Sequence, residues 1–256
     1  MVHLALFDID GTLIRSTGLD DRCYARAVTD VFGIAGFSTD WMDYRHSTDS
    51  GIITELVQNR LGRDPTGGEM ERFQEHFLGL LKAAFDRDPG ELAAVPGAAE
   101  LIQALESSGR WRAGIATGTW RRCARWKLTL AGLDPDALPL ATADDALDRA
   151  EIVLTAIHRA VGMPTPAAPA KACPPSRGVP PEGIVYVGDG PWDWRTARRL
   201  GIGFVGVAAG GDSRRLSQAG VEPVVEDFLA PDRVLRLLEA AARAPTPALL
   251  AAVAGP

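Results

Sequence analysis

Residues 3–13 read His-Leu-Ala-Leu-Phe-Asp-Ile-Asp-Gly-Thr-Leu, and this stretch decides how the rest of the chain is interpreted. The run up to Ile9 is short and apolar, which is typical of a buried parallel strand that ends in a polar loop. Asp8 and Asp10 lie two residues apart at the end of this strand, so their side chains point to the same side. Two neighbouring carboxylates repel each other and require a cation or a shared proton. An ordinary turn is the alternative, because Asp-Gly is common after a strand.

The composition restricts the class of protein. The chain has 256 residues, of which 46% are hydrophobic and 23% are charged, as expected for a globular protein of one large α/β domain or a domain with an insertion. Its formal net charge of −6 argues against broad electrostatic binding to nucleic acid or acidic membranes. Cys23, Cys123 and Cys173 show no metal-binding spacing, and no apolar run is long enough to span a bilayer. We therefore expect a cytoplasmic protein with reduced thiols.

After Pro96-Gly97 the pattern alternates between strand and helix. The predicted strands are Trp111–Ala116, Leu138–Ala141, Ile184–Val187, Phe204–Val207 and Val224–Val225. The predicted helices are Ala98–Ser107, Trp120–Ala131, Ala150–Val161, Trp194–Leu200 and Asp232–Ala242. Such alternation predicts a Rossmann-like α/β fold, in which a parallel sheet carries helices on both faces. Right-handed crossovers then bring the carboxyl ends of all strands to one edge, where ligands bind.

Two segments depart from this alternation. Residues 17–92 contain amphipathic stretches and no convincing strand, which predicts a small helical unit inserted after the first strand. Residues 163–182 contain seven prolines and cannot form a regular helix or a central strand. A surface insertion is favoured there over a functional lid.

Two later strands also end in polar residues. Thr117 and Gly118 follow the strand at 111–116, and a hydroxyl with neighbouring backbone N–H groups is suited to holding phosphate oxygens. Asp189 and Asp193 follow the strand at 184–187. Asp189 can supply a hard oxygen ligand for Mg²⁺, whereas Asp193 either serves the same site or caps the following helix. Together with Asp8 and Asp10 they predict a metal–phosphate site.

These three motifs, in this order, resemble those of the haloacid dehalogenase-like hydrolase superfamily, in its branch similar to phosphoglycolate phosphatase. The resemblance covers essentially the whole chain. It implies that Asp8 is the nucleophile that forms an aspartyl-phosphate and also a Mg²⁺ ligand. It implies that Asp10 is the general acid and then the base, and that its backbone carbonyl binds Mg²⁺. An aspartate at this second position favours phosphatases and phosphomutases over dehalogenases.

The resemblance also assigns the remaining site residues. Thr117 and Gly118 would bind the transferring phosphoryl group, Asp189 would complete the protein's share of the Mg²⁺ shell, and Asp193 would support the metal's water network. Residues 17–92 would form a mobile helical cap domain, and residues 1–16 and 93–256 would form the discontinuous core domain.

The chain departs from the family's pattern at the cation that holds nucleophile and phosphate together. The family usually has a lysine at the start of the helix before the Gly-Asp strand, and this chain has Arg149 there. Arginine keeps the charge but is bulkier than lysine. Lys171, in the proline-rich segment, is the alternative, and a surface salt bridge is the ordinary role for Arg149. The other two lysines, Lys82 in the helical unit and Lys127 inside the helix after Thr117, are given no role.

The cap would supply substrate contacts. Residues 44–51 precede a predicted cap helix, and Arg45, His46 and Thr48 are the candidates to contact the leaving group. Helix capping is an equally good reason for a threonine at such a position.

The predicted function is therefore a Mg²⁺-dependent phosphatase that acts on a small phosphorylated metabolite. A phosphomutase similar to β-phosphoglucomutase is the nearest alternative, because mutases of this family share the motifs. A non-catalytic phospho-acceptor module is a second alternative, since such α/β domains also use strand-end aspartates. The substrate and the oligomeric state do not follow from the sequence.

Overall fold

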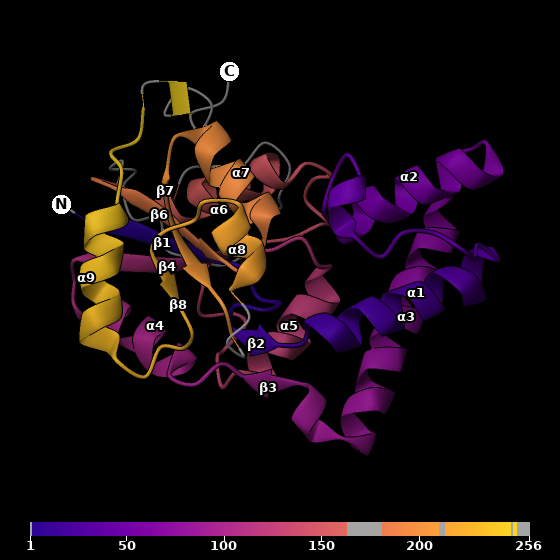
Figure 1. Ribbon diagram of the computed structural model, residues 1–256, viewed down its shortest axis with the longest axis horizontal. Coiled ribbons are helices and arrows are strands. Elements are labelled where there is room, and N and C mark those ends of the chain that lie inside the picture. The colour runs from indigo at the N-terminus through magenta and orange to yellow at the C-terminus, as the bar shows by residue number, and fades with distance from the viewer. Residues whose placement is uncertain (1, 163–180, 210–212, 247, 250–256) are drawn as a thin grey trace.

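A central sheet of six parallel strands organises the computed structural model, which describes residues 2–162, 181–209, 213–246 and 248–249 (Figure 1). The strand order is β5-β4-β1-β6-β7-β8. The strands are β1 (His3–Phe7), β4 (Trp111–Ala116), β5 (Leu140–Ala141), β6 (Ile184–Gly188), β7 (Gly203–Val207) and β8 (Val224–Val225). This topology confirms the predicted α/β class with a parallel sheet.

The first strand lies in the middle of the sheet because its side chains are apolar on both sides. Ala5 and Phe7 belong to one hydrophobic cluster, and Leu4 and Leu6 belong to the other. All four side chains are at most 2% exposed. Such a continuous apolar run is what a strand buried on both faces requires.

Helices cover the two faces of the sheet. On the side of Phe7 lie α4 (Ala98–Ser107), α5 (Arg121–Leu130) and α9 (Pro231–Ala241). On the side of Leu6 lie α6 (Arg149–Val161), α7 (Pro191–Leu200) and α8 (Arg214–Gln218). The predicted helices on both faces are therefore confirmed.

The predicted helical unit is formed by α1 (Thr17–Phe32), α2 (Asp49–Leu61) and α3 (Gly67–Arg87), with short 3-10 turns at Trp41–Asp43 and Pro89–Glu91. Figure 1 shows these helices beside the sheet. The chain enters and leaves this unit through an antiparallel strand pair, β2 (Ile14–Arg15) and β3 (Ala93–Ala94). These strands lie at the boundaries predicted for the cap, 16/17 and 92/93, and the division into two domains stays a prediction.

An aromatic cluster joins the helical unit to the core. Tyr24 stacks on Trp120 with ring centroids 6.2 Å apart, and Phe73 meets Trp120 edge-to-face at 5.3 Å. Trp120 is completely buried, and its Nε1 donates to Ser50 Oγ at 2.7 Å. The packing of these rings fixes the orientation of α1 and α3 over the strand ends.

Some predicted bounds were wrong. The strand expected at Leu138–Ala141 covers only Leu140–Ala141, and helix α7 begins three residues earlier than expected, at Pro191. The strands β2 and β3 and the helix α8 were not predicted. Residues 163–180, and with them Lys171 and Cys173, lie outside the described residues. None of the described helices is both long and apolar enough to cross a membrane.

Candidate active site

The three central strands bring the predicted motifs together. Strand β1 pairs with β4 and β6, and Phe7 lies opposite both Ile115 and Val187. One or two residues after these three paired positions come Asp8, Thr117 and Asp189. They line one pocket between the sheet edge and the helical unit, together with Asp10, Gly118 and Arg149. The pocket has a volume of about 650 Å³, including its open mouth.

Two aspartates in this pocket have the properties of cation ligands. One carboxylate oxygen each from Asp8, Asp189 and Asp193 lies within 4.8 Å of the other two. The Oδ1 atoms of Asp8 and of Asp189 are buried and accept no hydrogen bond from the described residues. Carboxylate oxygens at this spacing are the donor set that Mg²⁺ prefers. The donor set therefore fits a magnesium ion.

The pKa values of these two groups also fit a site for a cation. Burial and the charge of Asp193 raise the pKa of Asp8 to about 7, although Arg149 and Thr117 lower it. Burial and the charges of Asp193 and Asp8 raise the pKa of Asp189 well above its usual range. The charge of an ionised Asp8 thus disfavours the ionisation of Asp189. A divalent cation bound between the two carboxylates would offset this repulsion.

Gly11 allows Asp189 to approach the first strand. The backbone of Gly11 has a φ of +76°, and a Cβ at this position would lie 2.0 Å from Asp189 Oδ2. Only glycine satisfies both the left-handed conformation and this close approach. Gly11 therefore allows the chain to turn after Asp10 and also leaves room for the carboxylate of Asp189.

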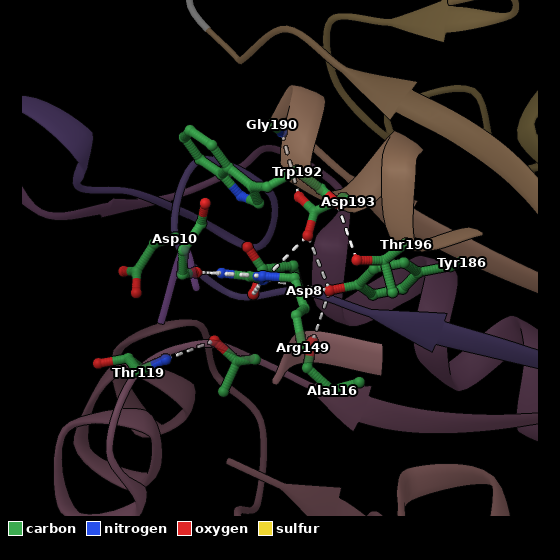
Figure 2. Close-up of polar contacts among 12 residues, drawn as sticks. Asp8, Asp10, Ala116, Thr119, Arg149, Tyr186, Gly190, Trp192, Asp193 and Thr196 are labelled. Atoms are coloured by element: carbon green, nitrogen blue, oxygen red, sulfur yellow. Dashed lines mark hydrogen bonds and ion pairs between the residues drawn. The ribbon is translucent and has the colours of Figure 1, made fainter. Parts of the chain in front are cut away.

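Asp193 supports the site through hydrogen bonds. Its carboxylate accepts from the Gly190 backbone N–H at 3.1 Å, from the Tyr186 hydroxyl at 2.9 Å and from Arg149 Nη1 at 2.9 Å (Figure 2). The side chain is fully buried. Asp193 thus caps α7, as the structural alternative anticipated, and also holds the guanidinium of Arg149.

Arg149 is the first residue of α6 and lies beside Asp8. Its Nη1 is 3.6 Å from Asp8 Oδ1, and its Nη2 donates to the Ser47 carbonyl at 2.7 Å. Its side chain is only 10% exposed. The burial excludes the ordinary surface salt bridge as its role. The guanidinium links Asp8 to the segment before α2.

Gly118 is needed because the guanidinium packs against its backbone. A Cβ on Gly118 would lie 2.2 Å from Arg149 Nη2. The Gly118 carbonyl accepts from the Asp49 N–H at 2.8 Å, which ties the loop after β4 to the start of α2. Thr117 is 1% exposed, and its hydroxyl interacts with the Asp8 carboxylate. Both residues line the pocket together with Asp8.

The sequence interpretation missed Lys127. This residue of α5 is completely buried, and its Nζ lies 2.6 Å from Asp10 Oδ1 and 2.7 Å from Asp20 Oδ1. The helix buries Cys123, Ala124, Lys127 and Leu128. These positions form one helical face, so Lys127 was recognisable as a charge on a buried stripe.

The contact with Lys127 decides the ionisation of Asp10. Burial alone would raise the pKa of Asp10, but the charge and the hydrogen bond of Lys127 outweigh it, and the pKa is lowered. The Ser16 hydroxyl donates to the same Oδ1 at 2.6 Å. The contact with Lys127 therefore favours the ionised form of Asp10 and directs its side chain to α5.

The three cap candidates lie in different places. Thr48 lines the pocket, but its hydroxyl donates to the Leu147 carbonyl at 2.8 Å and accepts from the Gly51 N–H, so it caps α2. Arg45 is exposed and does not line the pocket. His46 Nδ1 lies 3.8 Å from Asp148 and also lies outside the pocket lining. Their contact with a leaving group stays a prediction.

Known phosphatases are similar to this chain along most of its length. Validoxylamine A 7'-phosphate phosphatase of Streptomyces hygroscopicus subsp. limoneus is 28% identical over 226 residues, which are 86% of this chain and 92% of that protein. Phosphoglycolate phosphatase of Rhodospirillum rubrum is 26% identical over 230 residues, covering 89% and 88% of the two chains. These relatives confirm the predicted branch and the predicted enzyme class, a phosphoric monoester hydrolase.

Solved structures share the fold. A hydrolase from Pseudomonas syringae superposes with a TM-score of 0.66 at 24% identity, over 93% of this chain and 99% of that one. CbbY from Rhodobacter sphaeroides, in complex with xylulose-1,5-bisphosphate, superposes with a TM-score of 0.62 at 20% identity, over 90% and 96%. A family model described as haloacid dehalogenase-like hydrolase matches residues 2–201, the span that supplies every strand-end residue of the pocket. The chain therefore belongs to the haloacid dehalogenase-like hydrolases.

Proposed function

We propose that this protein is a Mg²⁺-dependent phosphatase that hydrolyses a small organic phosphate monoester through a phosphorylated Asp8. One observation carries the proposal. Asp8 and Asp189 each have a buried oxygen that accepts no hydrogen bond from the described residues, one oxygen from each carboxylate lies within 4.8 Å of the other, and the Arg149 guanidinium is 3.6 Å from Asp8. A carboxylate beside a cation site and a guanidinium is suited to in-line attack on phosphorus.

The chain's own residues have distinct roles in this mechanism. Asp8 attacks phosphorus and accepts the phosphoryl group. The Thr117 hydroxyl, the Gly118 backbone and Arg149 orient the phosphoryl oxygens and offset their charge. Asp10 gives a proton to the leaving oxygen and then takes one from the hydrolytic water. The contact with Lys127 favours the ionised form of Asp10, which is the form that the water step needs.

Magnesium would be held by Asp8, Asp189 and the Asp10 carbonyl, with Asp193 in support. When bound, it neutralises charge on the transferring phosphoryl group and keeps Asp8 ionised. The chain contributes the position of the ligands. Gly11 keeps Asp189 close to β1, and the hydrogen bonds of Asp193 hold Arg149 at the phosphate side.

The phosphomutase alternative receives less support. A mutase has to hold a second phosphate, for which a further cation in the pocket is needed. Among the described residues that line the pocket, Arg149 is the sole cation. Product analysis with a hexose phosphate decides the matter, because a mutase isomerises the sugar phosphate without releasing phosphate.

The Asp8→Asn variant tests the proposed function. We expect it to lose Mg²⁺-dependent release of phosphate from p-nitrophenyl phosphate, while its circular dichroism spectrum is unchanged. Asp86→Asn is the matched control, because Asp86 is exposed on α3, outside the pocket. Hydrolysis by Asp8→Asn at the wild-type rate would contradict the mechanism. We also propose that the protein is located in the cytoplasm.

A further inference from the structure

Asp49, the first residue of α2, is tied to the loop after β4 by three hydrogen bonds. Its carboxylate Oδ2 accepts from the Thr119 hydroxyl at 2.8 Å and from the Trp120 N–H at 3.2 Å. Its backbone N–H donates to the Gly118 carbonyl at 2.8 Å. One residue of the helical unit therefore contacts three consecutive residues of the loop, and it lines the same pocket as Gly118 and Thr119.

The start of α2 does not need this carboxylate as a cap. Thr48 is the N-cap of the helix, and its hydroxyl accepts from the Gly51 N–H at 3.1 Å. An aspartate in the first turn also stabilises a helix through the helix dipole, but it can do so from the solvent. The Asp49 carboxylate is instead directed to the loop after β4.

The buried position of this carboxylate is costly. Burial raises the pKa of Asp49 to about 7, although the hydrogen bonds from Thr119 and Trp120 and the charge of Lys127 lower it. A carboxylate held in such surroundings reduces stability, and groups of this kind gather at functional sites. A role in the pocket accounts for this cost better than packing does.

The loop that Asp49 contacts lies on the proposed phosphate side of the pocket. The Thr119 N–H donates to the Thr117 hydroxyl at 3.4 Å, and this hydroxyl in turn interacts with the Asp8 carboxylate (Figure 2). A continuous chain of contacts thus joins Asp49 to Asp8. Gly118, in the middle of the loop, has no side chain to restrict its backbone. The loop therefore depends on contacts from outside to keep one conformation.

The same segment of the helical unit holds the second group on the phosphate side. The Ser47 carbonyl, two residues before Asp49, accepts from Arg149 Nη2 at 2.7 Å. A Cβ on Gly118 would lie 3.1 Å from this carbonyl and 2.2 Å from Arg149 Nη2, so the loop packs closely against both. Residues 47–49 therefore contact both groups that are proposed to bind the phosphoryl oxygens.

We propose that Asp49 is a positioning residue, which holds the loop at residues 117–119 in the conformation that binds the transferring phosphoryl group. It acts through the Thr119 hydroxyl, the Trp120 N–H and the Gly118 carbonyl. The inference rests on the proposed phosphatase function and deepens it, because the phosphate site then depends on a residue of the helical unit. Without the carboxylate, the two donors lose their acceptor, and the loop gains conformations in which Thr117 no longer faces Asp8.

Replacement of Asp49 by alanine and by asparagine in the full chain tests the proposal. The readouts are kcat/KM for p-nitrophenyl phosphate with Mg²⁺ and the inhibition constant of inorganic phosphate, which reports on the phosphate site without a leaving group. We expect Asp49→Ala to raise the inhibition constant and to lower kcat/KM, each by roughly 10- to 100-fold. Asp49→Asn keeps an oxygen that accepts from Thr119 and Trp120, so it should restore most of both losses.

Asp232→Ala is the matched control. Asp232 lies in the first turn of α9, is exposed and does not line the pocket. Its replacement also removes a carboxylate from the first turn of a helix, so both constants should stay at their wild-type values. Urea unfolding followed by circular dichroism gives the stability of each variant, and the kinetics are measured where all variants are folded.

Thr119→Val removes the hydroxyl from the other side of the contact. We expect changes in the same direction as in Asp49→Ala. In the double variant the loss should be smaller than the product of the two single losses, because both substitutions remove one interaction. If Asp49→Ala does not fold, Thr119→Val takes its place, since it keeps the shape of the side chain and the buried carboxylate.

The outcomes separate the positioning role from the proposed function. Wild-type values of both constants in folded Asp49→Ala, or in Thr119→Val where only that variant folds, would overturn the positioning role and leave the proposed phosphatase intact. Inactivity of the wild-type protein on p-nitrophenyl phosphate and on a panel of phosphorylated metabolites with Mg²⁺ would overturn the proposed phosphatase, and the positioning role with it.

Discussion

Lys127 Nζ lies 2.6 Å from Asp10 Oδ1, and no part of the Lys127 side chain is exposed. The same ammonium lies 2.7 Å from Asp20 Oδ1. One buried cation therefore serves two carboxylates, one of them the proposed acid–base group. Burial of such a cluster is tolerated only while all its members are present, because each charge depends on the others.

Removal of Lys127 should destabilise the protein. In Lys127→Met, Asp10 and Asp20 stay buried without their cation, and we expect the free energy of unfolding to fall by about 3–5 kcal/mol. Urea unfolding followed by circular dichroism measures it. Lys82→Met on the exposed side of α3 is the control and should change stability by less than about 0.5 kcal/mol. An equally small change in both variants would show that the cluster contributes nothing.

Gly11→Ala should impair the site more than the fold. The substitution strains a left-handed residue by about 1–2 kcal/mol and also drives a Cβ into the Asp189 carboxylate. Gly62→Ala is the matched control, because Gly62 has a φ of +69° and nothing lies within 4 Å of its added Cβ. We expect similar losses of stability in urea and a large loss of Mg²⁺-dependent turnover in Gly11→Ala only. Equal turnover in the two variants would argue against Asp189 as a ligand.

Arg149→Lys should lower kcat although it keeps the charge. A lysine cannot contact Asp193, the Ser47 carbonyl and Asp8 together, since it lacks the planar fork of arginine. We expect kcat for p-nitrophenyl phosphate to fall by roughly 10- to 100-fold. The control is Arg199→Lys, because Arg199 is 65% exposed and pairs with Asp148 at the surface. Unchanged kcat in Arg149→Lys would show that charge alone suffices.

Stabilisation by Mg²⁺ should increase with pH. The pKa of Asp8 is raised to about 7 in the folded protein, above its ordinary value of 3.8, so folding binds a proton between these values. Ionisation of Asp8 therefore costs stability as the pH rises from about 4 to 7, and a bound cation removes this cost. We expect the Mg²⁺-induced rise in Tm to be larger at about pH 8 than at about pH 5. Scanning calorimetry measures it, and a rise that is the same at both pH values would contradict the assignment of Asp8.

Much of the site was predictable because each motif is local. Asp8, Thr117 and Asp189 follow apolar strands directly, and parallel β-α units bring such positions to one edge. Arg149 was predictable as the first residue of a helix, although its contacts with Asp193 and the Ser47 carbonyl were not. Local pattern and the handedness of the crossovers are therefore sufficient to bring these strand-end residues together.

The rest depends on packing between distant segments. Lys127 meets Asp10 and Asp20 across more than 100 residues of sequence, so its partners cannot be read from neighbours. The strands β2 and β3 have two residues each, which is too short to show periodicity. Asp20, Asp21 and Asp49 line the pocket only because α1 and the start of α2 face the strand ends. Contacts of this kind can be identified only from the three-dimensional structure.

Trapping of the phosphorylated enzyme tests the central claim most directly. The protein is mixed with p-nitrophenyl phosphate and Mg²⁺, quenched, reduced with borohydride and analysed by peptide mass spectrometry. An acyl phosphate is reduced to an alcohol, so we predict homoserine in place of Asp8, only when the ester is present. Rapid hydrolysis of the ester with Asp8 unmodified and another residue reduced would contradict Asp8 as the nucleophile.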